Sequence, residues 1–187
     1  MDPQTLIDIL KVATKLKTTM RHCWLAEGRQ ESVADHSWRI ALMAMLLESE
    51  FPDIDINKVI KMCLIHDLGE AFTGDIPTFI KTNEDALTED DIFQAWINQF
   101  PEPTKSSWQS LLEEMNALET NEAKMFKALD KIEALISHNE SDLSTWLPLE
   151  YDLQYTYGVE NMQFSDYFIA LRQLVDEWTT EKINNEK

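Results

Sequence analysis

The stretch LIHDLGEAFTGDIPT, residues 64–78, carries the pattern that decides the fold and the candidate site. An apolar helical run ends in His66, Asp67 and Glu70, and a Gly-Asp turn and a proline follow at once. Side chains three and four positions apart lie along one edge of a helix, so these ionisable groups gather at one helix end. A helix that only packs into a core does not need them. The stretch therefore predicts a helix whose carboxyl end faces a ligand.

The length and charge of the chain limit what it binds. With 187 residues, 44% of them hydrophobic, the chain is long enough for one domain with a substantial core. No run of about 18 apolar residues occurs, which argues against a membrane-spanning helix. The net charge of -18 disfavours nucleic acid polymers and anionic membranes, since clustered Lys and Arg bind both. A phosphate-bearing substrate therefore needs a metal ion or a few placed cations that reverse the local field.

The N-terminal sequence and the cysteines predict a cytoplasmic protein. The first residues mix acids and lysines, and they lack the positive start, apolar core and small-residue cleavage site of a signal peptide. Cys23 and Cys63 have no CxxC spacing, and Cys63 lies inside an apolar run. Such cysteines are typical of reduced, buried thiols in the cytosol, so we expect no disulfide.

Apolar residues at helical spacing predict an all-α fold in a single domain without strands. Ser32 followed by Asp35, and Thr88 followed by Asp91, fit capping boxes that start helices near residues 33 and 89. Prolines fall between the periodic segments, where they end helices. Helices are expected over 4–18, 33–50, 55–69, 89–99, 104–117, 120–139 and 162–183, with irregular or briefly helical chain over 71–88 and 140–161.

Two further side chains are candidates to join His66 and Asp67 at the helix end. His36 lies one turn into the capped helix, with apolar residues on its inward face. Asp130 lies among apolar residues of an amphipathic helix, where an isolated buried charge needs a partner. Two imidazoles and two carboxylates form a mixed nitrogen and oxygen site that suits Mn, Fe, Co, Ni or Zn. The pattern indicates one divalent transition metal and leaves its identity open.

Three stretches of the chain together match a known family. They are ESVADHS at 31–37, HDLGEAFTGDIP at 66–77 and EAKMFKALDKIEAL at 122–135. In order and spacing they resemble the HD-domain metal-dependent phosphohydrolases, and among these the 5'-deoxynucleotidase-like members. The resemblance implies one HD-domain helical bundle over residues 1–187, with the metal site within about 21–140 and the C-terminal helices completing the bundle. Such relatives are commonly dimers, so it also implies a homodimer.

The resemblance assigns roles to individual residues. It implies that one divalent metal is bound by His36, His66, Asp67 and Asp130. It implies that Glu70 and Asp75 handle the attacking water and its protons. General chemistry agrees, because a bound divalent metal lowers the pKa of water and nearby carboxyl groups transfer protons. Which of the two carboxyl groups is the base and which the acid stays open.

The resemblance also implies contacts with the substrate. Arg21, fifteen residues before His36, matches a family arginine that contacts the phosphate, and arginine suits bidentate phosphate binding. Trp24, Pro77 and Lys81 complete the expected substrate contacts. Many relatives carry tryptophan directly after this arginine, where it is tied to discrimination at the sugar, whereas this chain reads RHCW. The sugar preference therefore stays open.

The leading prediction is a metal-dependent hydrolase that removes the 5'-phosphate from ribo- or deoxyribonucleoside monophosphates. One alternative is an HD hydrolase of another phosphate ester, such as a sugar phosphate or an alarmone. Another is a nucleotide-binding sensor that keeps the metal site without turnover. Of the remaining histidines, His22 is a candidate pocket residue and His138 is expected at the surface of a helix end. Neither is assigned as a ligand.

Overall fold

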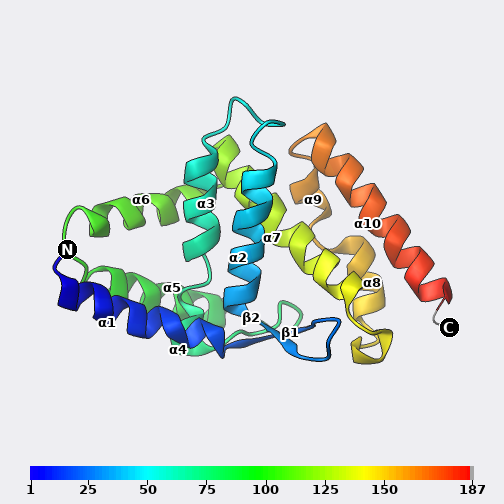
Figure 1. Ribbon diagram of the computed structural model, residues 1–187, viewed down its shortest axis with the longest axis horizontal. Coiled ribbons are helices and arrows are strands. Elements are labelled where there is room, and N and C mark those ends of the chain that lie inside the picture. Colours follow the sequence, from blue (N-terminus) through cyan, green and yellow to red (C-terminus); the bar gives the residue numbers. More distant parts are fainter. Residues whose placement is uncertain (186–187) are drawn as a thin grey trace.

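The computed structural model describes residues 1–185, and nearly all of its regular structure is helical (Figure 1). This confirms the predicted helical fold class, with one small sheet as an exception. None of the helices in this range combines the length and the apolar character that a membrane crossing requires. The elements are α1 (Pro3–Ala13), the 3-10 turn η1 (Thr14–Lys17), β1 (Met20–Trp24), β2 (Gln30–Ser32), α2 (Val33–Leu46), α3 (Ile56–Ile65), α4 (Glu70–Thr73), α5 (Asn83–Ile97), α6 (Thr104–Ala117), α7 (Asn121–Glu140), the 3-10 turn η2 (Leu143–Thr145), α8 (Glu150–Thr156), α9 (Val159–Met162) and α10 (Asp166–Asn185).

The long helix α7 forms the centre of the fold. Helices α2 and α3 lie side by side against it, and α6 and α10 also pack on it (Figure 1). The core between these helices is closed to solvent, with Ile40 of α2, Met62 of α3 and Leu129 of α7 fully buried. Apolar residues at helical spacing thus produce one continuous core. This packing brings three helices together at the candidate site.

The start of α2 follows from a local signal in the sequence. The Ser32 side chain accepts a hydrogen bond from the Asp35 amide, and the Asp35 carboxylate accepts one from the Ser32 amide. This capping box satisfies two amides that the first helical turn leaves unpaired. It confirms the predicted start at residue 33 and fixes His36 in the first turn, facing the core.

The predicted start of the next capped helix was wrong. Helix α5 begins at Asn83, because Thr82 and Asp85 form the capping box there. Thr88 lies inside the helix and donates its hydroxyl to the carbonyl of Glu84. Both threonines precede an aspartate by three positions, so the sequence offers two equivalent boxes, and the earlier one forms.

A two-stranded hairpin corrects the expectation of no strand. Strands β1 and β2 pair antiparallel, with Met20 opposite Ser32 and Trp24 opposite Gln30, and the register is irregular between these pairs. Gly28 takes a positive φ of 82° in the connecting turn. The strands are five and three residues long, too short to show the alternating pattern by which a strand is detected.

Several helix ends also differ from the prediction. The segment expected as one helix over 55–69 ends as α3 at Ile65, and a turn over 66–69 leads into α4. The segment expected over 162–183 contains the break between α9 and α10, while 140–161 holds the short α8. Tertiary packing sets these boundaries, and periodicity alone does not locate them.

Candidate functional site

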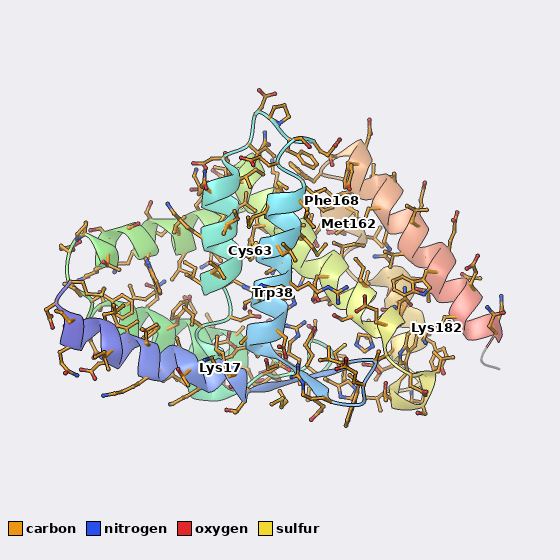
Figure 2. The ribbon with its side chains drawn as sticks, in the orientation of Figure 1. Lys17, Trp38, Cys63, Met162, Phe168 and Lys182 are labelled. Carbon is orange, nitrogen blue, oxygen red and sulfur yellow. The ribbon has the colours of Figure 1, made fainter. Side chains whose placement is uncertain are left out.

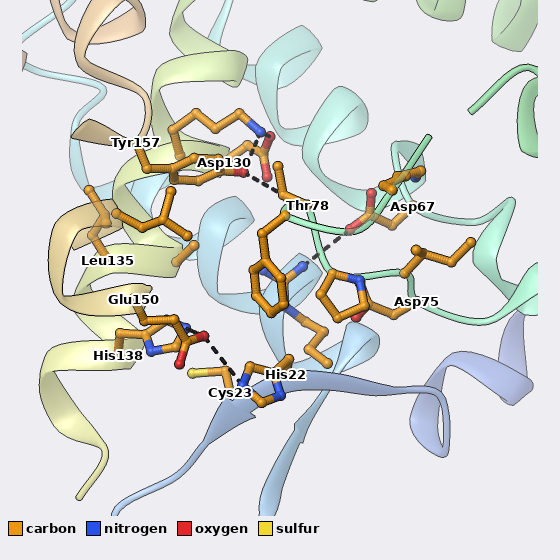
Figure 3. A pocket seen from close by; sticks show the side chains of 18 of the residues that line it. His22, Cys23, Asp67, Asp75, Thr78, Asp130, Leu135, His138, Glu150 and Tyr157 are labelled. Carbon is orange, nitrogen blue, oxygen red and sulfur yellow. Dashed lines mark hydrogen bonds and ion pairs between the residues drawn. The ribbon is translucent and has the colours of Figure 1, made fainter. Parts of the chain in front are cut away.

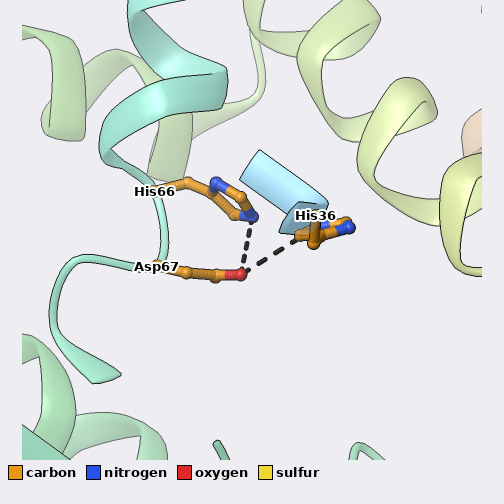
Figure 4. A group of neighbouring side chains, drawn as sticks. All are labelled: His36, His66 and Asp67. Carbon is orange, nitrogen blue, oxygen red and sulfur yellow. Dashed lines mark ion pairs between the residues drawn. The ribbon is translucent and has the colours of Figure 1, made fainter. Parts of the chain in front are cut away.

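His36, His66, Asp67 and Asp130 come together from three separate helices. Figure 4 shows His36 from α2 and His66 at the end of α3 facing the carboxylate of Asp67. Asp67 Oδ2 lies 2.9 Å from His66 Nε2 and 3.9 Å from His36 Nε2, and these three side chains offer ligand atoms within 4.8 Å of one another. Asp130 of α7 lies outside that tight group, but its Oδ1 is 3.3 Å from His36 Nε2 and 3.8 Å from His66 Nε2.

The two imidazoles are oriented so that each turns a nitrogen lone pair toward this centre. His66 Nδ1 lies 2.9 Å from the carbonyl of Cys63, and His36 Nδ1 lies 2.5 Å from Glu133 Oε2. A carbonyl and a carboxylate only accept, so both Nδ1 atoms carry a proton, and loss of a proton from Nε2 leaves a lone pair there that faces the cluster. Both Nε2 atoms are buried without a hydrogen-bond partner in the described part of the chain. Such atoms need a ligand.

The two oxygens of Asp130 have different partners. Oδ2 accepts ion pairs from Lys127 at 3.0 Å and Lys131 at 3.3 Å, while Oδ1 faces the imidazoles. Although burial opposes ionisation, these lysines and His36 hold the pKa of Asp130 well below its usual range. Asp130 is therefore an ionised acceptor facing the cluster.

The cluster attracts positive charge. Burial and the Arg21 cation lower the pKa of His36, but Glu133 and Asp130 outweigh them and raise it to about 9. Without an ion, a proton thus occupies the centre of the cluster, and metal binding would release it. Two nitrogens and two carboxylate oxygens, buried and convergent, fit a divalent transition metal.

Two further carboxyl groups lie near the cluster, on Glu70 at the start of α4 and on Asp75 just after that helix. Glu70 is 5% exposed, and its Oε2 is buried without a partner in residues 1–185. Burial, with the charges of Asp67 and Asp75, raises the pKa of Glu70 to about 10. Burial also raises the pKa of Asp75, and Asp67 adds to that rise. Both carboxyl groups therefore retain protons at higher pH than usual.

Two glycines shape this turn. A Cβ on Gly69 would lie 3.0 Å from Glu89 Cγ and 3.3 Å from Phe93 Cβ, so α5 packs closely over the turn. Gly74 takes a positive φ of 80° and reverses the chain after α4, just before Asp75. The residues between His66 and Asp75 thus determine the path of the backbone as well as supplying reactive side chains.

A pocket of about 510 Å³ opens beside the cluster and extends away from it. Figure 3 shows Asp67, Asp75 and Asp130 toward one end and His22, His138 and Glu150 toward the other. The segment after Gly74 forms one wall, and the hydroxyl of Thr78 lies 3.3 Å from that of Tyr157 on the opposite side. The volume is typical of small-molecule sites, which span roughly 300–1,000 Å³.

The predicted substrate contacts differ in where the fold places them. Arg21, Pro77 and Lys81 line the pocket. Arg21 Nε lies 3.0 Å from Glu31, and its Nη1 lies 3.6 Å from Asp67, so its cation lies next to the ligand cluster. Lys81 is paired with Glu89 at 2.7 Å. Trp24, at the end of β1, is not among the residues that line this pocket.

Sequence reasoning missed several residues around the site. Glu133 lies inside the stretch that carried the resemblance, and its position on the buried face of α7, three residues after Asp130, could have flagged it. Glu31 also lies inside a stretch that carried the resemblance, and the structure leaves it 1% exposed. His138 was expected at the surface but lines the pocket. Glu150 gave no signal, because only the packing of α8 brings it there.

Comparisons with known proteins agree with this geometry. A sequence profile described as HD domain matches residues 13–172. The 5'-deoxynucleotidase HDDC2 of Dictyostelium discoideum is 34% identical over 149 residues, which cover 72% of this chain and 76% of that protein. The 5'-deoxynucleotidase hdd1 of Schizosaccharomyces pombe is 31% identical over 160 residues, 76% of this chain and 80% of that protein. A crystal structure described as a predicted metal-dependent phosphohydrolase from Magnetospirillum magnetotacticum superposes with a TM-score of 0.79 at 25% identity, covering 95% of this chain and 92% of that one.

Proposed function

The chain belongs to the HD domain family, and from this premise we propose that it is a metal-dependent phosphohydrolase that removes the 5'-phosphate from deoxyribonucleoside monophosphates. One observation carries the proposal. Two buried imidazole nitrogens, which have no hydrogen-bond partner in residues 1–185, share a centre with the carboxylates of Asp67 and Asp130. The Arg21 cation lies 3.6 Å from Asp67 in the same pocket. A metal site beside a cation suits a phosphate ester.

The residues proposed to hold the metal are His36, His66, Asp67 and Asp130. When bound, a divalent metal supplies a Lewis acid that lowers the pKa of water to near neutrality. The mixed donor set favours Mn, Fe, Co, Ni or Zn over calcium or a thiolate-selected ion. His36 and His66 keep their Nε2 lone pairs in place through the hydrogen bonds at Nδ1.

The protein's own side chains bind the phosphate and move the protons. Arg21, next to the cluster, binds the phosphate oxygens and offsets the acidic surroundings. Glu70 and Asp75 between them accept the proton of the attacking water and return one to the leaving 5'-oxygen. Lys81 adds positive charge to the phosphate end, and Pro77 contributes to the wall that excludes water. Trp24, which lies outside the pocket lining, is the remaining residue proposed to contact the substrate.

The deciding experiment is phosphate release from metal-free protein supplied with Mn, Co, Mg or Zn. The substrates are ribo- and deoxyribonucleoside 5'-monophosphates, sugar phosphates and an alarmone. We expect metal-dependent release of phosphate from deoxyribonucleotides. Asp67→Asn should abolish this release, and the exposed Asp90→Asn should leave it intact. Release from the other esters alone would instead identify a different phosphohydrolase. Nucleotide binding without any release would identify a sensor.

We also propose that the protein is a cytoplasmic homodimer. Cys23 and Cys63 are buried free thiols, as in a reducing compartment. An apolar stripe runs along the outer face of α2, where Figure 2 labels Trp38, and it suits contact with a second copy. The stripe consists of Trp38, Leu42, Met45 and Leu46.

A further inference from the structure

A second cluster of ionisable side chains lies at the end of the pocket away from the metal ligands. Glu150 Oε1 lies 3.3 Å from His22 Nε2 and 3.6 Å from His138 Nε2, and all three residues line the pocket (Figure 3). None of them enters the proposed chemistry at the phosphate. The cluster therefore needs its own explanation.

The carboxylate of Glu150 is held so that one oxygen is left for the pocket. Glu150 is 3% exposed and begins α8, and its Oε2 accepts the amide proton of Leu147 at 2.6 Å. Oε1 faces the two imidazoles instead. A buried acid fixed on one side by the backbone presents one acceptor in a defined direction.

The imidazoles flank this acceptor as donors. Unlike the rings at the metal cluster, neither ring has an acceptor at Nδ1 in residues 1–185, so Nε2 of His22 and of His138 can each carry a proton toward the carboxylate. His22 Nε2 is buried, and it forms no hydrogen bond of good geometry with any group in residues 1–185. Burial lowers the pKa of His138, which keeps that ring neutral. This end of the pocket thus offers Glu150 Oε1 as a hydrogen-bond acceptor, flanked by the imidazole N–H donors of His22 and His138.

The path of β1 explains how one short segment serves both ends of the pocket. Neighbouring residues of a regular strand point to opposite faces, yet Arg21 and His22 both line the pocket. The irregular register of β1 between Met20 and Trp24 permits this. A 5'-nucleotide whose phosphate lies at Arg21 would direct its base toward the far end, where apolar Leu135 and Leu153 also line the wall.

We propose, resting on the proposed nucleotidase function, that His22, Glu150 and His138 bind the nucleobase and select the imide edge of uracil and thymine. That edge presents a carbonyl, a ring N–H and a second carbonyl, which complements the donor, acceptor and donor of the cluster. The ring N–H donates to Glu150 Oε1, and the carbonyls accept from the imidazoles. Cytosine has the same ring size, but its amino group, ring nitrogen and carbonyl pair with only one of the three groups.

The test compares dUMP with dCMP, which differ only at this edge. We expect the wild-type protein to prefer dUMP in kcat/KM by about tenfold or more, because an unmatched buried polar group weakens binding. Glu150→Gln retains an oxygen for the Leu147 amide and turns an NH2 group into the pocket. It should reduce the dUMP to dCMP ratio by about tenfold, whereas Glu160→Gln on the exposed face of α9 should not change it. If Glu150→Gln does not fold, His138→Gln is measured by the same ratio.

Calorimetric binding of deoxyuridine and deoxycytidine separates this inference from the proposed function. Equal hydrolysis of both nucleotides, unaffected by either variant, would overturn the base subsite and leave the phosphohydrolase standing. Preferred binding of deoxyuridine that Glu150→Gln removes, without hydrolysis of any nucleotide, would support the subsite and overturn the nucleotidase. Absence of both hydrolysis and binding would overturn both.

Discussion

His36 donates its Nδ1 proton to Glu133 at 2.5 Å, and both side chains are fully buried. The contact belongs to a longer chain of polar groups. The Ser137 hydroxyl lies 2.7 Å from Glu133 and 3.0 Å from Glu31, and Glu31 in turn pairs with Arg21. One buried network thus connects a proposed metal ligand with the proposed phosphate-binding arginine.

The pKa values of the two acids in this network move in opposite directions. Although burial opposes ionisation, the contact with His36 holds the pKa of Glu133 below its usual value. Burial and repulsion from Glu133 raise the pKa of Glu31. The Ser137 hydroxyl has one proton to share between them. Glu133 is therefore the ionised partner that keeps the His36 Nε2 lone pair directed at the metal.

Glu133→Gln should weaken metal binding about 10- to 100-fold, because a neutral amide orients His36 less firmly and lowers its basicity. Competition with a fluorescent chelator measures the affinity. Glu113→Gln provides the control, since it is the same substitution at an exposed position on α6. Equal affinities for wild type and Glu133→Gln would contradict a positioning role.

Arg21→Lys should reduce kcat/KM for the nucleotide by about tenfold or more, since lysine keeps the charge but loses the planar, bidentate contact with the phosphate. Metal affinity should change little, because Arg21 is no ligand. Steady-state kinetics with metal titration separate the two effects. Arg29→Lys is the control, as Arg29 is an exposed cation paired with Asp35. A loss confined to metal affinity would argue against phosphate contact.

Metal removal should lower the melting temperature, because the ion binds only the folded cluster. At a free metal concentration about 100 times Kd, the gain in unfolding free energy is about 2.7 kcal/mol. Thermal unfolding with chelator and then with added Mn or Zn measures the shift. Asp130→Asn should abolish most of it, whereas Asp90→Asn, exposed on α5, should retain it. A shift of equal size in all three proteins would place the ion elsewhere.

The stability of the metal-free protein should depend on pH through Glu70. Its raised pKa of about 10 means that the folded state keeps a proton that the unfolded chain releases above about pH 4.5. The unfolding free energy therefore falls as pH rises from about 5 toward 10, by at most about 1.4 kcal/mol per pH unit from this group. Glu70→Gln removes this ionisation, so the unfolding free energy of the variant should rise relative to that of wild type between pH 5 and 8.

Urea unfolding with chelator at several pH values measures this difference. Glu113→Gln is the control, because Glu113 is exposed on α6 and its substitution should leave the pH slope of wild type unchanged. Parallel pH profiles for wild type and Glu70→Gln would show that Glu70 is already ionised in the metal-free fold.

The apolar stripe on α2 should determine the oligomeric state. Trp38→Glu together with Met45→Glu should convert a particle of twice 21.8 kDa into one of 21.8 kDa, as light scattering after gel filtration measures. Leu174→Glu on α10 is the matched control, since Leu174 and Trp38 are each 63% exposed. A wild-type monomer, or a dimer that the control breaks and the α2 variant does not, would contradict this interface.

Local signals in the sequence predicted much of the helical fold. The Ser32 capping box fixed the start of α2, and the helix expected over 104–117 forms with those bounds. Both rest on neighbours within one helical turn. The choice between the boxes at Thr82 and Thr88, and the hairpin of β1 and β2, depend on packing that neighbouring residues do not encode.

The sequence by itself determined the class of fold, the helix that ends in His66 and Asp67, and the residue types available for a metal and a phosphate. These follow from spacing along the chain, because a helix relates residues three and four apart. Only the tertiary structure decided that Glu133 orients His36 and that Glu150 joins two histidines at the far end of the pocket. The contacts of Glu133 with His36 and of Glu150 with His22 join residues about 100 positions or more apart, and only the packing of β1, α2, α7 and α8 brings them together.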